Sequence, residues 1–276
     1  MNGFISEVRN HLQFYRIPSF EATGQVEHGF TTRGGGVSEG PYWSLNTAFH
    51  VGDAVESVRA NRALACGALG INPDDVVAGK QVHGDRVEVV SLSDKGRGAR
   101  LFEDALTDVD ALVTAERGVP LSSYYADCVP IFLLDPVKKV VALAHAGWKG
   151  TVAKIGLKTV KKMVKVFGTK PADCLAGVGP SIGPCCYEVS GQVVGLFKKS
   201  FSNGEELAEF LHPGKWRLNL WKANYHTLLE AGLPENNIAV ASVCTSCRSD
   251  LFFSYRAEGG ITGRMASFIM LKQVKG

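Results

Sequence analysis

The chain has 276 residues, of which 45% are hydrophobic and 21% charged, and its formal net charge at pH 7 is +3. These proportions are those of a globular protein, and no apolar run approaches the roughly 18 residues of a membrane-spanning helix, so disordered, collagen-like and membrane proteins are excluded. Nucleic-acid binding is not expected either, because it needs clustered Lys and Arg side chains rather than a small net excess.

The first half of the chain is predicted to be rich in short strands. Residues 29–53 contain many glycines, especially at 34–36, and leave no room for a regular element. A short helix is expected at 55–69. Apolar or β-branched runs separated by turn residues then predict strands at 86–91, 111–114, 120–125, 129–134 and 139–145.

The second half is predicted to contain most of the helices. The clearest one spans 150–167, because Gly168 follows its end and Pro171 comes soon after. Lysines on one side of it predict a solvated face, and they are Lys154, Lys158, Lys161, Lys162 and Lys165. The other expected elements are a strand at 174–178, helices at 191–200, 205–211 and 219–231, and strands at 238–243, 251–254 and 265–271.

This mixed order of elements predicts an α+β fold, a single domain with mixed β-sheets flanked by helices. No fixed-period repeat or Pro/Ser linker divides the chain, so we expect residues 1–276 to form one unit. The first 16 residues carry scattered charges and lack the features of a secretory signal, which predicts a cytoplasmic protein. Seven irregularly spaced cysteines predict reduced thiols. We expect a monomer or a weak homo-oligomer.

Three short segments place a good metal ligand at a strand end or in a tight turn beside glycine or proline. The ligands are His83, Cys128 and His145. Two imidazoles and a thiolate suit Zn²⁺, and three protein ligands leave a fourth position for water or substrate, as in catalytic zinc sites. The spacing matches no local ligand template, so two alternatives stay open. One is a metal-free Cys/His nucleophile, and the second is a set of ordinary half-buried side chains.

Several further residues are weaker candidates for binding or redox chemistry. Arg33 stands before three glycines whose backbone N–H groups could form an anion-binding nest, although an ordinary turn with a surface arginine fits the pattern equally well. Arg62 and Lys80 are further phosphate-binding candidates, but such residues usually only meet solvent.

Four cysteines also form suggestive patterns. Cys244 and Cys247 have the CxxC spacing of redox or zinc sites, but no second pair is nearby in the sequence, so incidental thiols are the favoured interpretation. Cys185 and Cys186 are interpreted as buried small residues rather than as a redox switch.

Ordered motifs cover nearly the whole chain from His28 to Leu271. They are HGFTTR (28–33), SLN (44–46), NR (61–62), QVHG (81–84), TDVDA (107–111), ADCVP (126–130), HAGWKG (145–150), GPSI (179–182), CT (244–245) and FSYR (253–256). With these motifs the sequence resembles the family formerly called multicopper polyphenol oxidases, or laccase-domain proteins, and now regarded as purine nucleoside phosphorylases.

The resemblance implies that His83, Cys128 and His145 bind zinc and form the catalytic site. It also implies phosphorolysis of adenosine, inosine, guanosine and methylthioadenosine, with adenosine deamination as a second activity. Lys149 stands where the family usually has Arg. A lysine keeps the positive charge but lacks the planar guanidinium group that can make two hydrogen bonds to a phosphate. The seven histidines include no His-x-His pair, which argues against a multicopper oxidase.

The resulting hypothesis is that zinc polarises a ligand or water while phosphate held by Arg33 attacks C1' of the ribose. For deamination the metal would activate water for attack on C6 of the purine. Asp127 is expected to face away from Cys128, as neighbours on a strand do. The alternatives are a Cys/His amide hydrolase that edits cell-wall precursors (muramyl-amino-acid nucleotides), and a non-catalytic nucleotide-binding module.

Overall fold

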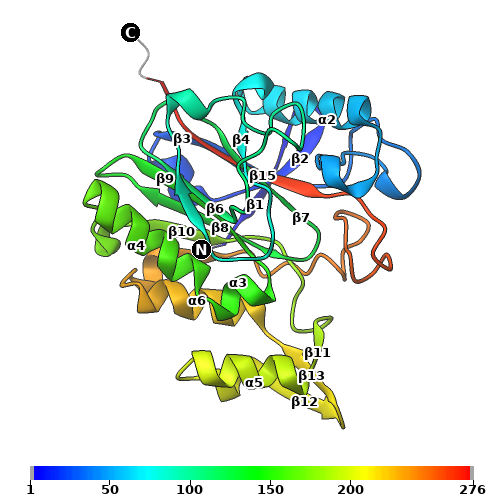
Figure 1. Ribbon diagram of the computed structural model, residues 1–276, viewed down its shortest axis with the longest axis vertical. Helices are drawn as coiled ribbons and strands as arrows, with labels where there is room; N and C mark the ends of the chain where they lie inside the picture. Colours follow the sequence, from blue (N-terminus) through cyan, green and yellow to red (C-terminus); the bar gives the residue numbers. More distant parts are fainter. Residues whose placement is uncertain (1–2, 274–276) are drawn as a thin grey trace.

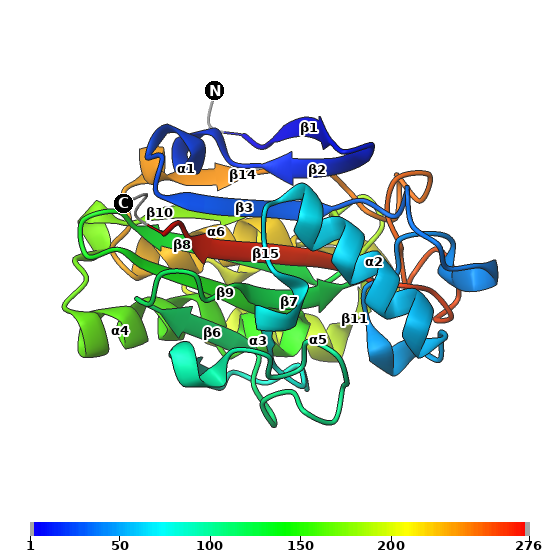
Figure 2. The ribbon, with the colours of Figure 1, turned by 90° about the horizontal axis from the view of Figure 1, so that it is seen from above.

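The architecture is built from two β-sheets that lie face to face, with helices on their outer faces (Figures 1 and 2). The computed structural model describes residues 3–273, and within them there are two six-stranded sheets and one three-stranded sheet. This arrangement confirms the predicted α+β fold with mixed sheets flanked by helices. None of the helices within this described region is both long and apolar enough to cross a lipid bilayer.

The first six-stranded sheet joins the beginning of the chain to its end. All neighbouring strands are antiparallel except the last pair, which is parallel. In spatial order the strands are β1 (Ile5–Arg9), β2 (Leu12–Arg16), β3 (Val26–Thr31), β15 (Met265–Leu271), β7 (Leu121–Tyr125) and β4 (Val77–Ala78).

The second six-stranded sheet is mixed and more deeply buried. Its two central strands have every residue buried, because one face meets the first sheet and the other meets helices, and this explains their continuous apolar runs. In spatial order the strands are β14 (Ile238–Val240), β10 (Leu175–Val178), β8 (Val129–Asp135), β9 (Val140–Ala146), β6 (Ala111–Thr114) and β5 (Val87–Val89).

Helices cover the outer faces of both sheets. Helix α2 (Val55–Ala68) lies over the first sheet, as Figure 2 shows, and packs Ala65 near Phe14 and Phe268. On the other side, α4 (Ile155–Phe167) and α6 (Leu220–Glu230) pack against the second sheet and each other. The shorter helices are α1 (Pro18–Ala22), α3 (Trp148–Val152) and α5 (Gly191–Ser200).

A small antiparallel sheet with α5 beside it forms the lower part of the view in Figure 1. Its strands are β11 (Glu188–Ser190), β13 (Lys215–Leu218) and β12 (Ala208–His212). The predicted helix at 205–211 is therefore wrong. Residues 204–207 form a 3₁₀ turn, and the rest is β12, which pairs with β13 across a turn at Gly214, where φ is +84°.

The long helix predicted at 150–167 is broken into α3 and α4. Lys154 between them adopts a left-handed conformation (φ 57°, ψ 47°), and its ammonium pairs with Glu230 of α6. Lys154 is itself neither glycine nor proline, and the nearest glycine, Gly156, lies inside α4, so the sequence did not indicate a break at this position. The predicted solvated face is confirmed for Lys158, Lys161 and Lys165, which are exposed, while Met163 is buried.

Two more predictions are wrong. A buried apolar residue need not pair with a neighbouring strand, and a glycine-rich segment can still contain short regular elements. The expected strand at 251–254 is irregular: Phe253 is fully buried, but its N–H points to the sulfur of Met265 rather than to a neighbouring strand. The supposedly element-free segment 29–53 begins inside β3 and includes 3₁₀ turns at Gly40–Tyr42 and Phe49–Val51. All seven cysteines are free thiols in the structure.

Candidate metal centre

Strand register brings two of the predicted ligands together. Strand β8 pairs with β9 so that Val129 faces Ala146, which places Cys128, just before β8, beside the end of β9. His145 is the penultimate residue of β9 and is only 3% exposed. Residues far apart in sequence therefore meet because antiparallel neighbours align their ends.

The third ligand arrives on the turn between β4 and β5. His83 has a positive φ of 59°, and the N–H groups of Val82, His83 and Gly84 all donate to the Asp110 carboxylate, at 3.2, 3.1 and 2.8 Å. Three successive N–H groups of the turn therefore surround one carboxylate, which fixes the conformation of the turn. The rings of His83 and His145 then lie 5.0 Å apart, centroid to centroid, in an edge-to-face arrangement.

One ligand atom from each of His83, Cys128 and His145 lies within 4.8 Å of the others. The structure thus brings together the three residues that the sequence analysis singled out. Among residues 3–273 no fourth protein donor joins this group. Two imidazoles and a thiolate could hold a metal ion, and they suit a tetrahedral Zn²⁺ that keeps one position open.

Asp110 also fixes the orientation of His145. The Nδ1 of His145 donates to the carboxylate at 2.8 Å, so Nε2 is the nitrogen left for a metal. The ladder explains this contact, because Ala111 pairs with Ala144 and Asp110 therefore lies next to His145. Sequence reasoning assigned Asp110 no role, although it belongs to the motif TDVDA and immediately precedes a correctly predicted strand.

The protonation states of the centre are coupled to one another. Burial opposes ionisation of Cys128, but the charge of His145 and hydrogen bonds from both histidines outweigh it and lower the pKa of the thiol to about 6. Burial also opposes the charged form of His145, but the Cys128 thiolate and Asp110 raise its pKa to about 9. Cys128 is therefore a thiolate at neutral pH, the form that binds metals.

The centre has little free space on the side of Gly147. A Cβ atom built on this residue would lie 2.9 Å from Cδ2 of His83 and 3.1 Å from Sγ of Cys128. The backbone there has φ −67° and ψ 175°, which any residue adopts. Glycine is needed at position 147 for close approach and not for its conformational freedom.

The three ligands line a cavity of about 520 Å³. A cavity of this size fits a small organic molecule. Four large aromatic side chains contribute to its walls, namely Tyr124, Trp148, Tyr187 and Tyr255. Such rings are suited to stacking on a planar heterocycle.

Two arginines supply positive charge to the same cavity. Arg256 donates to the carbonyl groups of Cys186 and Glu188 at 3.2 and 3.1 Å, and Arg264 donates to those of Thr262 and Gly263 at 2.7 and 2.9 Å. Within the described residues neither guanidinium forms an ion pair with a carboxylate. Both can therefore neutralise an anionic ligand.

Two further polar residues shape the wall. Asp127 lies in a turn (φ +84°) rather than on a strand, so the expectation that it faces away from Cys128 is wrong, and both residues line the cavity. Its carboxylate accepts from the hydroxyl of Thr245 and the N–H of Arg256, both at 2.7 Å. His50 is neutral at pH 7, because burial and the nearby charge of Arg264 lower its pKa to about 4.

The structure does not bring the predicted phosphate-binding residues into this cavity. Arg33 donates to the carbonyl groups of Trp43 and Ser249 and pairs with Glu258 at 2.9 Å, so its Nε and Nη1 are already engaged and its charge is matched by a carboxylate. Lys80 lies with its ammonium 5.7 Å from the ring of Phe102.

Arg62 does not line the cavity but contacts Tyr124, a residue of its wall. Its guanidinium is buried between the rings of Phe49 and Tyr124, at 4.2 and 4.4 Å, and donates to three backbone carbonyls. It therefore holds Tyr124, a wall residue, in place. The arginines that do line the cavity are Arg256, which lies in the FSYR motif, and Arg264, which no sequence motif indicated.

Comparison with known proteins identifies a family and relatives that match nearly the whole chain. Residues 27–272 match the family model described as multi-copper polyphenol oxidoreductase laccase. The chain is 39% identical over 249 residues to purine nucleoside phosphorylase YlmD of Bacillus subtilis (strain 168), covering 90% of each protein. It is 36% identical to adenosine deaminase RL5 of an unknown prokaryotic organism, covering 90% of this chain and 94% of that protein. The crystal structure of YlmD from Geobacillus stearothermophilus matches with a TM-score of 0.93 and 38% identity, over 99% of this chain and 100% of that one.

Proposed function

Because this chain belongs to the multi-copper polyphenol oxidoreductase laccase family, we propose that it is a zinc-dependent enzyme that cleaves purine nucleosides with phosphate and also deaminates adenosine. The substrates would include adenosine, inosine, guanosine and methylthioadenosine. The names of two relatives, a purine nucleoside phosphorylase and an adenosine deaminase, support both activities.

One observation carries the proposal: two imidazoles and a thiolate converge within 4.8 Å at the wall of a cavity that also contains aromatic side chains and two arginines. The aromatic side chains suit a purine, and the two guanidinium groups, which form no ion pair with a carboxylate in the described part of the chain, suit phosphate. A bound zinc ion would supply Lewis-acid polarisation to whatever occupies its open position.

The chain's own residues would perform the remaining tasks. Arg256 and Arg264 would orient the phosphate toward C1' of the ribose and lower the cost of bringing an anion into a largely apolar cavity. His50, as a neutral imidazole, would offer a hydrogen bond to substrate without adding a charge. Asp110 would keep Nε2 of His145 directed at the metal.

A metal-free amide hydrolase is the second candidate, and the ionised pair of Cys128 and His145 is the observation in its favour. Such a nucleophile needs one histidine, however, and leaves no task for His83 on the same centre. Three converging ligands therefore favour metal catalysis over a thiol nucleophile.

The test is to incubate the purified protein with inosine and inorganic phosphate and to measure hypoxanthine and ribose 1-phosphate. Adenosine without phosphate should separately yield inosine. Release of hypoxanthine only when phosphate is present would support the proposal. Turnover of a muramyl-amino-acid nucleotide with none of nucleosides would support the hydrolase, and nucleoside binding without turnover would support the non-catalytic module.

Variants separate the roles of the metal and the arginines. His83→Ala should lose the zinc bound at the centre of His83, Cys128 and His145, together with both activities. Arg256→Lys should raise the KM for phosphate roughly tenfold, because a lysine cannot make the bidentate contact, and leave deamination much less affected. Arg100→Lys is the matched control, since Arg100 is exposed and pairs with Asp74. An unchanged KM for phosphate in Arg256→Lys would refute its assigned role.

A further inference from the structure

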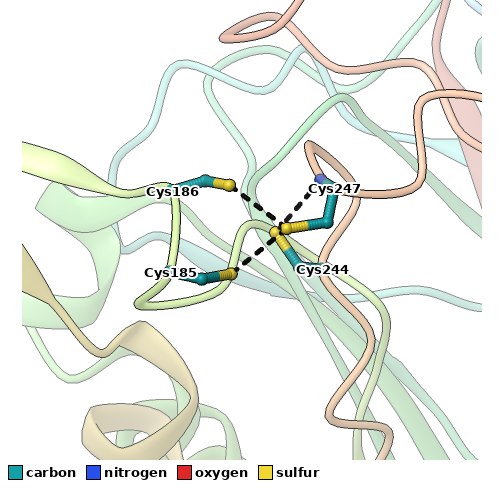
Figure 3. A group of neighbouring side chains, drawn as sticks. All are labelled: Cys185, Cys186, Cys244 and Cys247. Atoms are coloured by element: carbon teal, nitrogen blue, oxygen red, sulfur yellow. Dashed lines mark hydrogen bonds between the residues drawn. The ribbon is translucent and has the colours of Figure 1, made fainter.

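Four cysteines from two distant parts of the chain meet outside the cavity (Figure 3). Cys185 and Cys186 precede β11, and Cys244 and Cys247 follow β14. The premise behind the interpretation of the CxxC motif as incidental thiols, that no second pair is nearby, is thus wrong, because Cys185 and Cys186 complete the motif in space. The interpretation of the adjacent pair as buried residues is wrong as well, since Cys185 is exposed and Cys186 is half-buried.

We propose that Cys185, Cys186, Cys244 and Cys247 form a second, structural metal site that binds one zinc ion. This site is separate from the centre at His83, Cys128 and His145, and its assignment does not depend on the proposed catalytic activity.

The distances between the sulfur atoms fit a single ion. Four thiolates bound tetrahedrally to zinc at about 2.3 Å lie roughly 3.8 Å from one another. Here all four sulfurs lie within 4.8 Å of one another, and the Sγ of Cys247 is 3.4 Å from that of Cys185 and 3.3 Å from that of Cys186. A disulfide would join only two of the four and leave the convergence of the others unexplained.

The backbone around Cys244 is arranged for a thiolate ligand. Its sulfur is buried and accepts the N–H groups of Gly183 at 3.2 Å and Cys247 at 3.5 Å. Hydrogen bonds of this kind stabilise the charge on a metal-bound sulfur. An isolated bridge between Ser181 and Cys244 aligns the two segments, so the pairs face each other before any ion binds.

Four soft ligands in a closed set select zinc and leave no open position for substrate. On binding, each thiol that still carries a proton releases it to solvent, so that four thiolates and one Zn²⁺ carry a formal charge of −2. No electron is transferred. Exposure of Cys185 and Cys247 gives the ion a path from solvent.

The site would hold together one wall of the cavity. Ile182 and Tyr187, on either side of the adjacent cysteine pair, both line the cavity. Arg256 donates to the carbonyl of Cys186, and Thr245, inside the CxxC motif, donates to Asp127. An ion shared by the two segments would therefore fix the loops that position Arg256 and Asp127.

The first experiment uses cobalt(II) as a spectroscopic probe of the full chain. His83→Ala removes one ligand of the other centre, and the protein should still bind about one cobalt per chain with the strong thiolate charge-transfer absorption of a four-sulfur site. The double substitution Cys185→Ser with Cys247→Ser should abolish this absorption. Cys174→Ser is the matched control, because Cys174 is buried away from the cluster and contacts the carbonyl of Lys170.

The second experiment needs no substitution and stays informative if a variant fails to fold. Wild-type protein is treated with iodoacetamide with and without Zn²⁺, and each cysteine peptide is followed by mass spectrometry. Zinc should slow alkylation of Cys185 and Cys247 by about tenfold or more, since a bound thiolate is a poor nucleophile. Equal rates with and without zinc, a native disulfide between cluster cysteines, or bound iron and sulfide in place of one ion would each overturn the proposal.

Discussion

Replacing Gly147 with alanine isolates the geometry of the metal centre from the stability of the fold. The new Cβ would lie 2.9 Å from a carbon of the His83 ring and 3.1 Å from the sulfur of Cys128. Comfortable contacts between such atoms are about 3.5–4.0 Å, so at least one ligand must move by roughly 0.5 Å. A metal site tolerates deviations of only about 0.2 Å in its bond lengths.

The expected loss of metal affinity is therefore large and the expected loss of stability small. We expect zinc to bind about 10- to 100-fold more weakly, as when the support of a metal ligand is removed. The backbone at Gly147 already suits alanine, so the gain of about 0.4–1 kcal/mol from a stiffer unfolded chain offsets part of a roughly 1–3 kcal/mol packing strain.

The assay is competitive zinc titration against a chromophoric chelator, together with urea unfolding of the metal-free protein. The matched control is Gly195→Ala, because Gly195 lies inside α5 and a Cβ there would meet nothing within 4 Å. That variant should keep full zinc affinity and gain up to about 1 kcal/mol of stability. If Gly147→Ala bound zinc as tightly as the wild type, the requirement for close approach at this position would be refuted.

Three further predictions address the residues that support the site and the fold. Asp110→Asn should weaken zinc binding by about 10- to 100-fold in the same titration, because His145 loses its anionic acceptor, whereas exposed Asp108→Asn should not. Arg62→Lys should destabilise the fold by about 3 kcal/mol in urea unfolding, because three carbonyl groups lose their guanidinium donors. Burial, with the nearby charge of Arg16, holds the pKa of His28 well below 6.5, so the unfolded chain takes up a proton first as the pH falls. Lowering the pH from 7.5 to 5.5 should reduce the free energy of unfolding by about 1.4 kcal/mol through this residue. His28→Gln should therefore lose about 1.4 kcal/mol less than the wild type over the same interval.

Each of these has a result that would contradict it. Equal zinc affinity in Asp110→Asn and Asp108→Asn would mean that the hydrogen bond to His145 does not orient the ligand. A loss below about 1 kcal/mol in Arg62→Lys would mean that a lysine satisfies the buried carbonyls. Identical pH dependence of unfolding in wild type and His28→Gln would mean that His28 titrates alike in both states.

The sequence by itself determined the features that depend on local pattern or on residue chemistry. The apolar runs of the central sheet predicted β6, β8 and β9 to within a residue or two, and α5 and β15 were predicted with the observed bounds. The ligand types His, Cys and His indicated a metal centre, because donor softness is a property of the side chain alone.

Only the tertiary structure decided which distant segments meet. Segment 208–212 became a strand because β13 lies beside it, and the helix expected at 150–167 broke where Lys154 could reach Glu230. Phe253 was predicted to lie in a strand because it is apolar. Its backbone N–H donates to the sulfur of Met265 rather than to a neighbouring strand.

The residues of the candidate site were likewise decided by the tertiary structure and not by local sequence patterns. Arg33 carried the strongest local signal for an anion, yet it pairs with Glu258 outside the cavity, while Arg264 carried no signal and lines the cavity. Cys185 and Cys186 were assigned apart from Cys244 and Cys247, because about 60 residues separate the pairs and no local period links them. Such contacts are set by long-range pairing of strands and loops. A local sequence pattern gives no distance between segments that are far apart along the chain.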